Sequence, residues 1–289
     1  MADRTRQTIV VDGLALAQGI RKQLAEEVGR YAAAGKRVPC LAVVLAGDDP
    51  ASASYIMGKQ RACSRIGMDA IERRLPASAS EQDVLLVVEE LNLNDAVDGI
   101  LVQLPLPEGI SANEIAAAID PAKDVDALHP TTAGKLLLGT PTLAACTPLG
   151  IIEILDHYEI EIEAANAVVI GRSNIVGKPV SLMLQRRNAT VTMCHSKTRN
   201  LREVCQQADI LVAAVGVPRL VKADWIKAGA AVIDVGVSNI DGTLVGDVDT
   251  DGAMGIASIV TPHRRGVGPM TITMLLRNTL TAYRARTGE

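Results

Sequence analysis

Short apolar runs alternate with amphipathic stretches along the first 120 residues of the chain. The apolar runs have the length of strands and end at turn residues, whereas the stretches between them carry apolar residues at helical spacing. This alternation predicts a parallel β-sheet flanked by helices. The predicted strands are 8–11, 41–45, 70–75 and 99–104, and the predicted helices are 13–34, 52–66, 80–91 and 112–119.

A loop-rich stretch, residues 120–145, separates this half from a second α/β pattern. We therefore expect an α/β protein with two lobes: an N-terminal catalytic domain over residues 1–145 and a Rossmann-like domain over residues 146–269. The C-terminal helix, within residues 270–289, is expected to pack back on the first lobe. In the second half we predict helices at 148–158 and 271–284 and strands at 167–170, 190–194, 209–215 and 231–235.

The second pattern begins with a strand, a glycine turn and a helix. Ala167–Ile170 is rich in β-branched residues, Gly171 breaks the run, and Gly177 and Pro179 open a helical pattern. Free backbone N–H groups at such a helix start bind anions. The spacing is G-x-S-x-x-x-G rather than G-x-G-x-x-G, so an ordinary βα loop explains the stretch equally well.

The following strand favours a phosphorylated dinucleotide. In NAD-preferring units an acidic residue about 20 positions past the glycines holds the ribose 2′-hydroxyl. Here the strand that ends at Cys194 is followed by no acid, and Arg172 lies inside the glycine loop. We therefore predict NADP as the cofactor. The polar residues that follow the strand are Ser196, Lys197, Thr198 and Arg199.

The composition narrows the class of protein. The hydrophobic fraction of the 289 residues is 48% and Phe is absent, so two aliphatic cores are expected. A net charge of −4 without a long basic run makes nucleic acid an unexpected partner. No apolar run approaches a membrane span and no signal peptide is visible, so we expect neither. Five cysteines without C-x-x-C spacing favour a reduced cytoplasmic protein, and the four histidines show no metal-ligand spacing.

The first lobe contains candidate catalytic residues on a predicted helix and at the end of a predicted strand. Tyr55 and Lys59 are four residues apart on a predicted helix and share a face, which suits a planar heteroaromatic substrate and a proton transfer. An exposed lysine beside a tyrosine is the commoner explanation for an arbitrary helix. Gln103 stands at the carboxyl end of a predicted strand, where α/β proteins bind ligands, although a polar strand end facing water explains it equally well.

Two further stretches contain candidate functional residues, and each also has a purely structural explanation. Asp124 and Asp126 flank Val125 in a loop and could act as an acid/base pair, hold a substrate's N–H groups or, least favoured, bind a metal; turn capping is the alternative. Gly266, Gly268 and Pro269 precede the last helix, where glycines allow close approach of a ligand, although a plain helix start is also consistent.

Taken together, these motifs resemble the methylenetetrahydrofolate dehydrogenase/cyclohydrolase family. The resemblance spans nearly the whole chain, and the order and spacing of the motifs make it specific. The motifs are Tyr55-x-x-x-Lys59, Gly99-Ile-Leu-Val-Gln-Leu-Pro-Leu-Pro107, Lys123-Asp-Val-Asp126, Cys146-Thr-Pro148, Gly171-Arg-Ser-Asn-Ile-Val-Gly-Lys-Pro179, Cys194-His-Ser196, Asp234-Val-Gly236, Gly246-Asp-Val-Asp249 and Gly266-Val-Gly-Pro-Met-Thr271.

The resemblance implies oxidation of 5,10-methylenetetrahydrofolate by NADP+ and hydrolysis of the methenyl product to 10-formyltetrahydrofolate. It implies a cleft between the lobes that holds the folate, and a homodimer. By position, Lys59 matches the catalytic lysine, Gln103 the residue that tunes it, Tyr55 the stacking ring and Asp126 the residue at the pterin end. Gly266, Gly268 and Pro269 match substrate-side positions. The positions that match cofactor contacts are Gly171, Arg172, Ser173, Ser196, Val237 and Thr271.

The chain departs from the family pattern at the substrate side. His263-Arg264-Arg265-Gly266 replaces the usual Val-Pro-Gly-Gly, Ala127 replaces a common Gly, and Thr132 replaces an Asn. Three hypotheses follow: the bifunctional folate enzyme, which we favour; a drifted paralogue with one activity lost or another pterin-like substrate; and a non-enzymatic NADP-binding protein. Retention of Lys59, Gln103 and Asp126 argues against the last.

Overall fold

The structure, a computed structural model, describes residues 7–289, and the side chains of these residues apart from 50–54. The chain forms two compact units. Unit 1 contains the residues up to Ala17 and Thr147–Thr271, and unit 2 contains Gln18–Cys146 and Ile272–Glu289. The helices α1 (Gly13–Ala33) and α10 (Val267–Thr287) have residues in both units.

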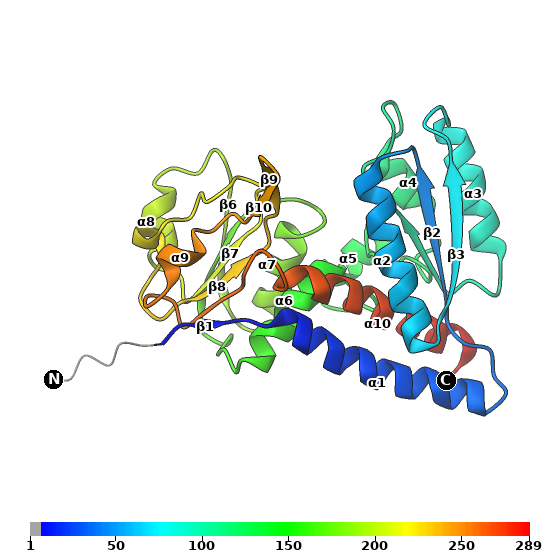
Figure 1. Ribbon diagram of the computed structural model, residues 1–289, viewed down its shortest axis with the longest axis horizontal. Coiled ribbons are helices and arrows are strands. Elements are labelled where there is room, and N and C mark those ends of the chain that lie inside the picture. The colour runs from blue at the N-terminus through cyan, green and yellow to red at the C-terminus, as the bar shows by residue number, and fades with distance from the viewer. Residues whose placement is uncertain (1–6) are drawn as a thin grey trace. The chain divides into compact units, whose positions relative to one another are not determined.

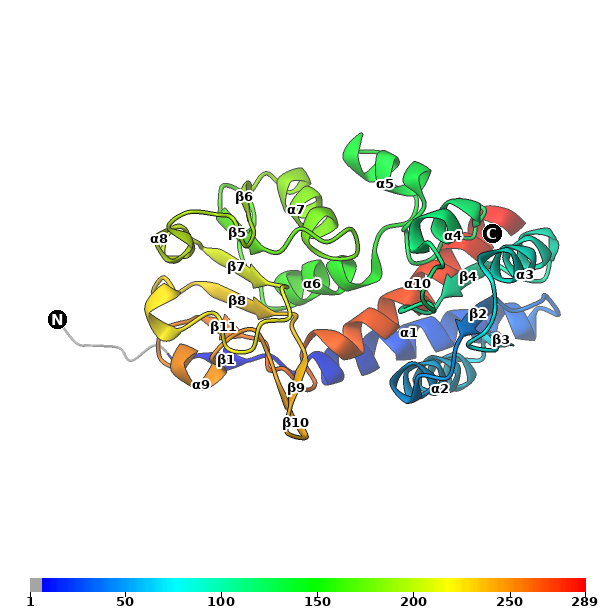
Figure 2. The same ribbon diagram turned by 90° about the horizontal axis from the view of Figure 1, so that it is seen from above.

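Unit 2 is built on a parallel sheet of three strands in the order β3-β2-β4. The central strand is buried along its whole length, as expected of a parallel strand covered on both faces. Figure 2 shows α2 on one face of this sheet and α3 and α4 on the other. The bounds are β2 Cys40–Ala46, β3 Asp69–Leu75, β4 Gly99–Val102, α2 Pro50–Ile66, α3 Glu81–Leu93 and α4 Ala112–Ala118.

The C-terminal part of α10 packs in unit 2 beside α1. The rings of Tyr31 and Tyr283 lie 5.1 Å apart, and the Tyr283 hydroxyl donates to the Arg37 carbonyl oxygen at 2.9 Å. An ion pair between Arg284 and Glu27 joins the same two helices. The last helix thereby completes the core of the unit that the first half of the chain begins.

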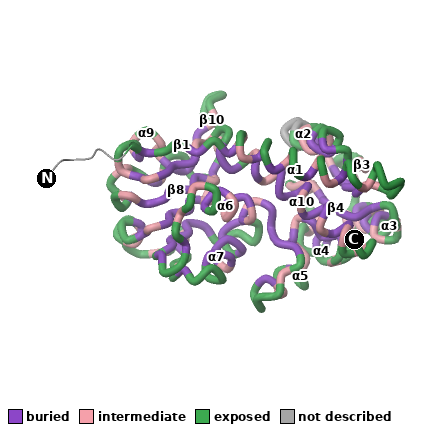
Figure 3. The backbone as a smooth tube through the Cα atoms, turned by 90° about the horizontal axis from the view of Figure 1, so that it is seen from below, coloured by how far each residue is buried: buried purple, intermediate pink, exposed green. Residues whose placement is uncertain are grey.

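Unit 1 contains a parallel sheet of six strands in the order β1-β11-β8-β7-β5-β6, which can be followed by its labels in Figure 2. Figure 1 shows β7 and β8 at the middle of this sheet. The inner strands β5, β7, β8 and β11 are almost wholly buried, whereas the edge strands β1 and β6 are largely exposed (Figure 3). Unit 1 also contains α6 Cys146–His157 (from its second residue), α7 Gly177–Arg186, α8 Leu201–Cys205, the short helices Ala223–Trp225 and α9 Thr250–Ala253, and the strands β1 Ile9–Val10, β5 Asn166–Ile170, β6 Thr190–Cys194, β7 Ile210–Ala213, β8 Ala231–Asp234, β9 Ser238–Ile240, β10 Thr243–Val245 and β11 Ile259–Val260.

The predicted α/β class with parallel sheets is confirmed, but several short elements differ from the prediction. The stretch 120–145 is not all loop, because α5 (Pro130–Leu137) lies within it. Pro130 occupies the start of that helix, and the His129 ring accepts a hydrogen bond from the Thr131 N–H at 2.9 Å. Among the described residues, no helix combines the length and apolar character that a membrane span requires.

Two of the departures from the family pattern lie in left-handed backbone. Ala127 has φ 57° and Arg265 has φ 65°, and both stand where the resemblance leads us to expect glycine. A side chain with a Cβ makes this conformation costly by roughly 1–2 kcal/mol. At these two positions the chain therefore adopts a backbone conformation that its side chains disfavour, at a cost in stability.

We predict that Ala127→Gly raises the free energy of unfolding by about 0.5–1 kcal/mol, because glycine removes the Cβ strain but adds freedom to the unfolded chain. The matched control is Ala133→Gly within α5, which should lower it by about 1 kcal/mol. Urea denaturation monitored by circular dichroism measures both. Equal losses in the two variants would contradict the strain argument.

Candidate active site

The amine of Lys59 and the amide of Gln103 meet in unit 2. Lys59 lies on α2 and its Nζ donates to Gln103 Oε1 at 2.8 Å. Gln103 directly follows β4, rather than lying within it, and its backbone N–H donates to the Val44 carbonyl at 2.9 Å. Its own amide nitrogen donates to the Leu104 carbonyl at 2.6 Å. The oxygen of Gln103 is therefore oriented toward the lysine by two bonds to the backbone.

Burial changes the proton affinity of Lys59. Desolvation lowers the pKa of its amine, and the charge of Asp126 opposes that shift without reversing it. Desolvation also raises the pKa of Asp126, against the opposing charge of Lys59 and a hydrogen bond with Cys146. Both groups are thus moved toward their neutral forms. An amine with a lowered pKa can accept a proton near neutrality, which an ordinary lysine cannot.

Cys146 is a third member of this cluster, and sequence reasoning gave it no role. Its thiol is buried and donates to the Val125 carbonyl at 3.3 Å. The Asn278 amide donates to the carbonyls of Val125 and Ala144 at 2.8 Å each. Burial holds the pKa of the thiol well above its usual range, so it remains protonated beside Asp126. The only sequence signal was the motif Cys146-Thr-Pro148.

The loop that carries Asp126 is fixed by a buried lysine. Lys123 is 1% exposed, and its Nζ donates to the carbonyls of Leu91, Asn92 and Asn94 at 3.0, 2.8 and 2.8 Å. These carbonyls lie at the C-terminal end of α3 and just past it, where a cation is favourable. Sequence reasoning did not identify this contact, because a buried lysine is rare and its partners are distant in sequence.

The structure separates the two aspartates that sequence reasoning treated as a possible pair. The carboxylate of Asp124 accepts the backbone N–H groups of Leu128 and His129 at 3.1 and 2.9 Å. It thus fixes the turn before α5, which is the capping alternative. Asp126 alone lies beside Lys59. Tyr55 lies one helical turn before Lys59 and is 58% exposed, so its ring is available for stacking.

A second cluster lies in unit 1, at the carboxyl ends of β5 and β6. Ile170 pairs with Cys194, so the loops that carry Arg172 and Ser196 start side by side, and both side chains are exposed. The Ser173 hydroxyl accepts the N–H groups of Val176 and Gly177 at 3.2 and 3.3 Å. Val237 lies in the loop after β8, which is separated from β5 in the sheet by β7 alone. Its side chain is 50% exposed.

The two glycines of this turn are required by close backbone packing. A Cβ on Gly171 would lie 2.3 Å from the Ala214 oxygen, and a Cβ on Gly177 would lie 2.2 Å from the Gly171 oxygen. Gly171 also has φ 126°, which favours glycine. The turn thereby brings the N-terminus of α7 against the sheet, which is the geometry that binds phosphate. The exposed cation, hydroxyls and helix start fit a phosphorylated dinucleotide.

The loop before α10 also lies in unit 1. A Cβ on Gly13 would lie 2.0 Å from the Gly266 oxygen, and one on Gly266 would lie 2.2 Å from the Pro262 oxygen. Gly268 has no heavy atom near its would-be Cβ, so its role is not one of packing within the described chain. Gly268 and Pro269 fall inside the first turn of α10, and the Thr271 hydroxyl lies 2.9 Å from that of Thr147.

The arginines of the departing loop have different surroundings. The Arg265 guanidinium forms an ion pair with Asp12 at 3.0 Å, within unit 1. Arg264 is exposed. One of the two long cations that replace the family's residues is thus held by a carboxylate of its own unit.

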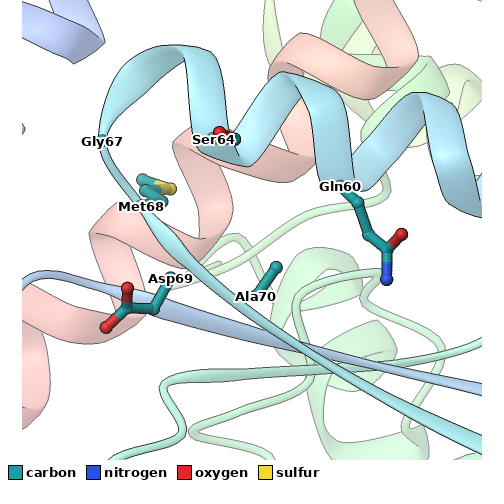
Figure 4. A pocket seen from close by; sticks show the side chains of 6 residues that line it. All are labelled: Gln60, Ser64, Gly67, Met68, Asp69 and Ala70. Carbon is teal, nitrogen blue, oxygen red and sulfur yellow. The ribbon is translucent and has the colours of Figure 1, made fainter.

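A surface hollow of about 460 Å³ lies elsewhere in unit 2 (Figure 4). Neither Lys59, Gln103 nor Asp126 lines it. Gln60, which does, donates to Glu72 at 2.5 Å. The hollow is therefore separate from the lysine cluster. Its lining residues are Gln60, Ser64, Gly67, Met68, Asp69 and Ala70.

Comparison with known families matches both halves of the chain. Residues 11–126 match the tetrahydrofolate dehydrogenase/cyclohydrolase catalytic domain, and residues 145–287 match the NAD(P)-binding domain of the same family. The chain belongs to this family. The resemblance found from the motifs is thereby confirmed.

Relatives of the family cover nearly the whole chain. The bifunctional protein FolD of Desulfovibrio desulfuricans is 48% identical over 283 residues, covering 96% of this chain and 99% of that protein. That of Exiguobacterium sibiricum is 50% identical, covering 95% and 99%.

Solved structures of the family agree with the fold. The bifunctional FolD of Campylobacter jejuni superposes with a TM-score of 0.94 at 41% identity, covering 96% of this chain and 99% of that one. The Trypanosoma brucei enzyme, solved with NADP cofactor and an inhibitor, gives 0.93 at 37% identity, covering 98% and 99%. None of these comparisons supports the drifted-paralogue hypothesis.

Proposed function

We propose that this protein oxidises 5,10-methylenetetrahydrofolate to the 5,10-methenyl cation with NADP+ and hydrolyses that cation to 10-formyltetrahydrofolate. The observation that carries the proposal is the partly buried amine of Lys59, bonded to Gln103 and placed near Asp126, in a chain of the dehydrogenase/cyclohydrolase family. A non-enzymatic NADP-binding protein would not need that arrangement, and the comparisons give no support to a drifted paralogue.

Lys59 serves as the proton-transfer group. Its lowered pKa leaves a neutral fraction that can take a proton from the water that attacks the methenyl carbon. Gln103 holds the amine in position through a fixed oxygen, and the ionised carboxylate of Asp126 accepts the N–H groups of a pterin ring. Tyr55 supplies a ring face for stacking. Gly266, Gly268 and Pro269 border the substrate by analogy with the family.

The turn of unit 1 holds the dinucleotide. When bound, NADP+ supplies the hydride acceptor, and the protein's part in that step is mainly alignment of the two reactants. The backbone at Gly171 and the start of α7 receive phosphate, and Arg172 with Ser196 recognises the ribose 2′-phosphate. Ser173, Val237 and Thr271 complete the contacts by analogy with the family.

Lys59→Ala is expected to lower the cyclohydrolase rate by about 10²- to 10⁴-fold, because the proton-transfer group is lost. The rate is measured as the decay of methenyl absorbance. NADP affinity, measured by calorimetry, should not change, since the turn that holds the dinucleotide is in the other unit. Arg61→Ala, an exposed cation on the same helix, is the control. Retention of both activities by Lys59→Ala would remove Lys59 from the mechanism.

Arg172→Ala is expected to raise the KM for NADP+ about tenfold or more and to leave the KM for NAD+ nearly unchanged, because only the former carries the 2′-phosphate. Steady-state dehydrogenase kinetics with each cofactor measure the effect. Arg186→Ala, an exposed arginine at the end of α7, should change neither value. Parallel losses with both cofactors would rule out this role for Arg172.

We also propose a homodimer formed through β3, in a reducing cytoplasm that suits five free, buried thiols. β3 is an edge strand, and an edge of seven residues pairs readily with a second copy. Antiparallel pairing centred on Arg73 sets each Glu72 against the other copy's Arg74.

Light scattering is expected to give twice the 30.4 kDa of the chain. Arg74→Glu should shift the protein toward monomer, because like charges then face each other, and the swap Glu72→Arg/Arg74→Glu should restore the dimer. A monomer before any substitution, or a dimer indifferent to Arg74→Glu, would refute this interface.

A further inference from the structure

Two buried carboxylates, Asp234 and Asp247, lie where β7 and β8 end, and the mechanism above uses neither. Asp234 is the last residue of β8 and is 2% exposed, and Asp247 follows β10 and is 0% exposed. Both belong to motifs that carried the family resemblance, but no role follows for them from the sequence. Burial of two neighbouring acids is costly unless both are well bonded.

Asp247 binds the backbone that continues β7. Its Oδ2 accepts the N–H groups of Val215 and Gly216 at 2.6 and 3.1 Å. Its Oδ1 is buried and has no hydrogen-bond partner in the described part of the chain. One oxygen of the carboxyl group therefore shapes the loop after β7, and the other can be replaced by an amide nitrogen without loss of a hydrogen bond.

Asp234 in turn holds the segment that carries Asp247. Its Oδ1 accepts the N–H groups of Gly236 and Asp247 at 3.1 and 2.9 Å, and its Oδ2 accepts that of Val248 at 3.1 Å. A Cβ on Gly246 would lie 1.8 Å from Asp234 Oδ2, and a Cβ on Gly236 would lie 2.1 Å from Asp247 Oδ1. The two glycines allow the backbone to close around both acids.

The loop held by Asp247 lies against the dinucleotide turn. Ala214, the residue before Val215, donates its N–H to the Ile170 carbonyl at 2.8 Å. Its own carbonyl oxygen packs where a Cβ on Gly171 would be, 2.3 Å away. The position of this loop therefore constrains the backbone conformation at Gly171. Gly171 in turn is in contact with Gly177 at the start of α7.

We propose that Asp247, itself held by Asp234, is a positioning residue for the dinucleotide: by binding the N–H groups of Val215 and Gly216 it sets the shape of the Gly171 turn. This inference rests on the proposed function, in which NADP binds at that turn. Asp247 acts through backbone atoms.

The charges of the pair make its action dependent on pH. Desolvation raises the pKa of Asp234 to about 7, three backbone N–H bonds oppose the shift, and the charge of Asp247 adds to it. Asp247 is the charged side chain that faces Asp234; the strands β7 and β8 and the Thr261 hydroxyl bring neutral groups. The folded unit favours the protonated form of Asp234. As the pH rises through about 7, Asp234 ionises and a second negative charge forms beside Asp247, which is unfavourable in the buried site.

The test compares Asp247→Ala with Asp247→Asn. Asparagine keeps an oxygen for Val215 and Gly216, places its NH₂ group where Oδ1 has no partner, and removes the charge. Alanine removes the acceptor. Asp247→Ala is expected to raise the KM for NADP+ about tenfold and to leave cyclohydrolase kinetics unchanged, because the lysine cluster lies in the other unit.

Asp247→Asn is expected to keep the KM for NADP+ within about threefold at neutral pH. In the wild type the KM for NADP+ should increase between about pH 6 and pH 8, and in Asp247→Asn this increase should flatten, because loss of the neighbouring charge lowers the pKa of Asp234. A merely structural role would lower both activities together and would leave the pH profile unmoved by the asparagine.

Calorimetric titration with NADP+ gives a readout that is independent of catalysis. If Asp247→Ala binds NADP+ as tightly as the wild type, the inference is wrong. If both variants lose NADP+ binding and cyclohydrolase activity in parallel with their melting temperature, the role is structural only and the inference also fails. Failure of the wild type to bind NADP+ would instead overturn the proposed function.

Discussion

Desolvation of the Lys59 amine is the constraint on which the catalytic half of the structure depends. A lysine on an open helix surface would keep its proton at neutral pH, whereas burial lowers its pKa. The residues around Lys59 do not offset this desolvation with a full ion pair. Gln103 offers a neutral oxygen, and burial moves the carboxyl of Asp126 toward its own neutral form. The cluster therefore holds protons that can move.

The precision of this cluster comes from contacts outside it. Gln103 is fixed because its backbone belongs to the ladder beside Val44. Asp126 is fixed because Lys123 joins its loop to the end of α3 and Asp124 joins it to the start of α5. In unit 1, glycines have the same purpose: the close packing of Gly171, Ala214 and Gly177 forms the anion-binding turn. Both units position chemistry with backbone contacts at the ends of parallel strands.

The sequence predicted the features that depend on regular pattern. Fully apolar runs such as the one in β2 and the amphipathic stripe of α1 gave the α/β class, and motif order gave the family. It did not predict α5 or the strands β9, β10 and β11, because these elements are too short for a hydrophobic period to develop. The roles of Lys123 and Cys146 were also missed. The partners of Lys123 are 29–32 residues away in the chain, and those of Cys146 include the amide of Asn278, 132 residues away. The left-handed backbone at Ala127 and Arg265 was not predicted either, because neither residue type favours that conformation.

The central claim is that one chain carries both activities. The most direct test incubates the wild-type protein with methylenetetrahydrofolate and NADP+ and follows NADPH and methenyltetrahydrofolate absorbance in the same cuvette. Our account predicts that NADPH forms without accumulation of the methenyl compound, because Lys59 supports its hydrolysis. Absence of NADPH formation despite measurable NADP+ binding would contradict the account and would mean that the protein acts on another substrate.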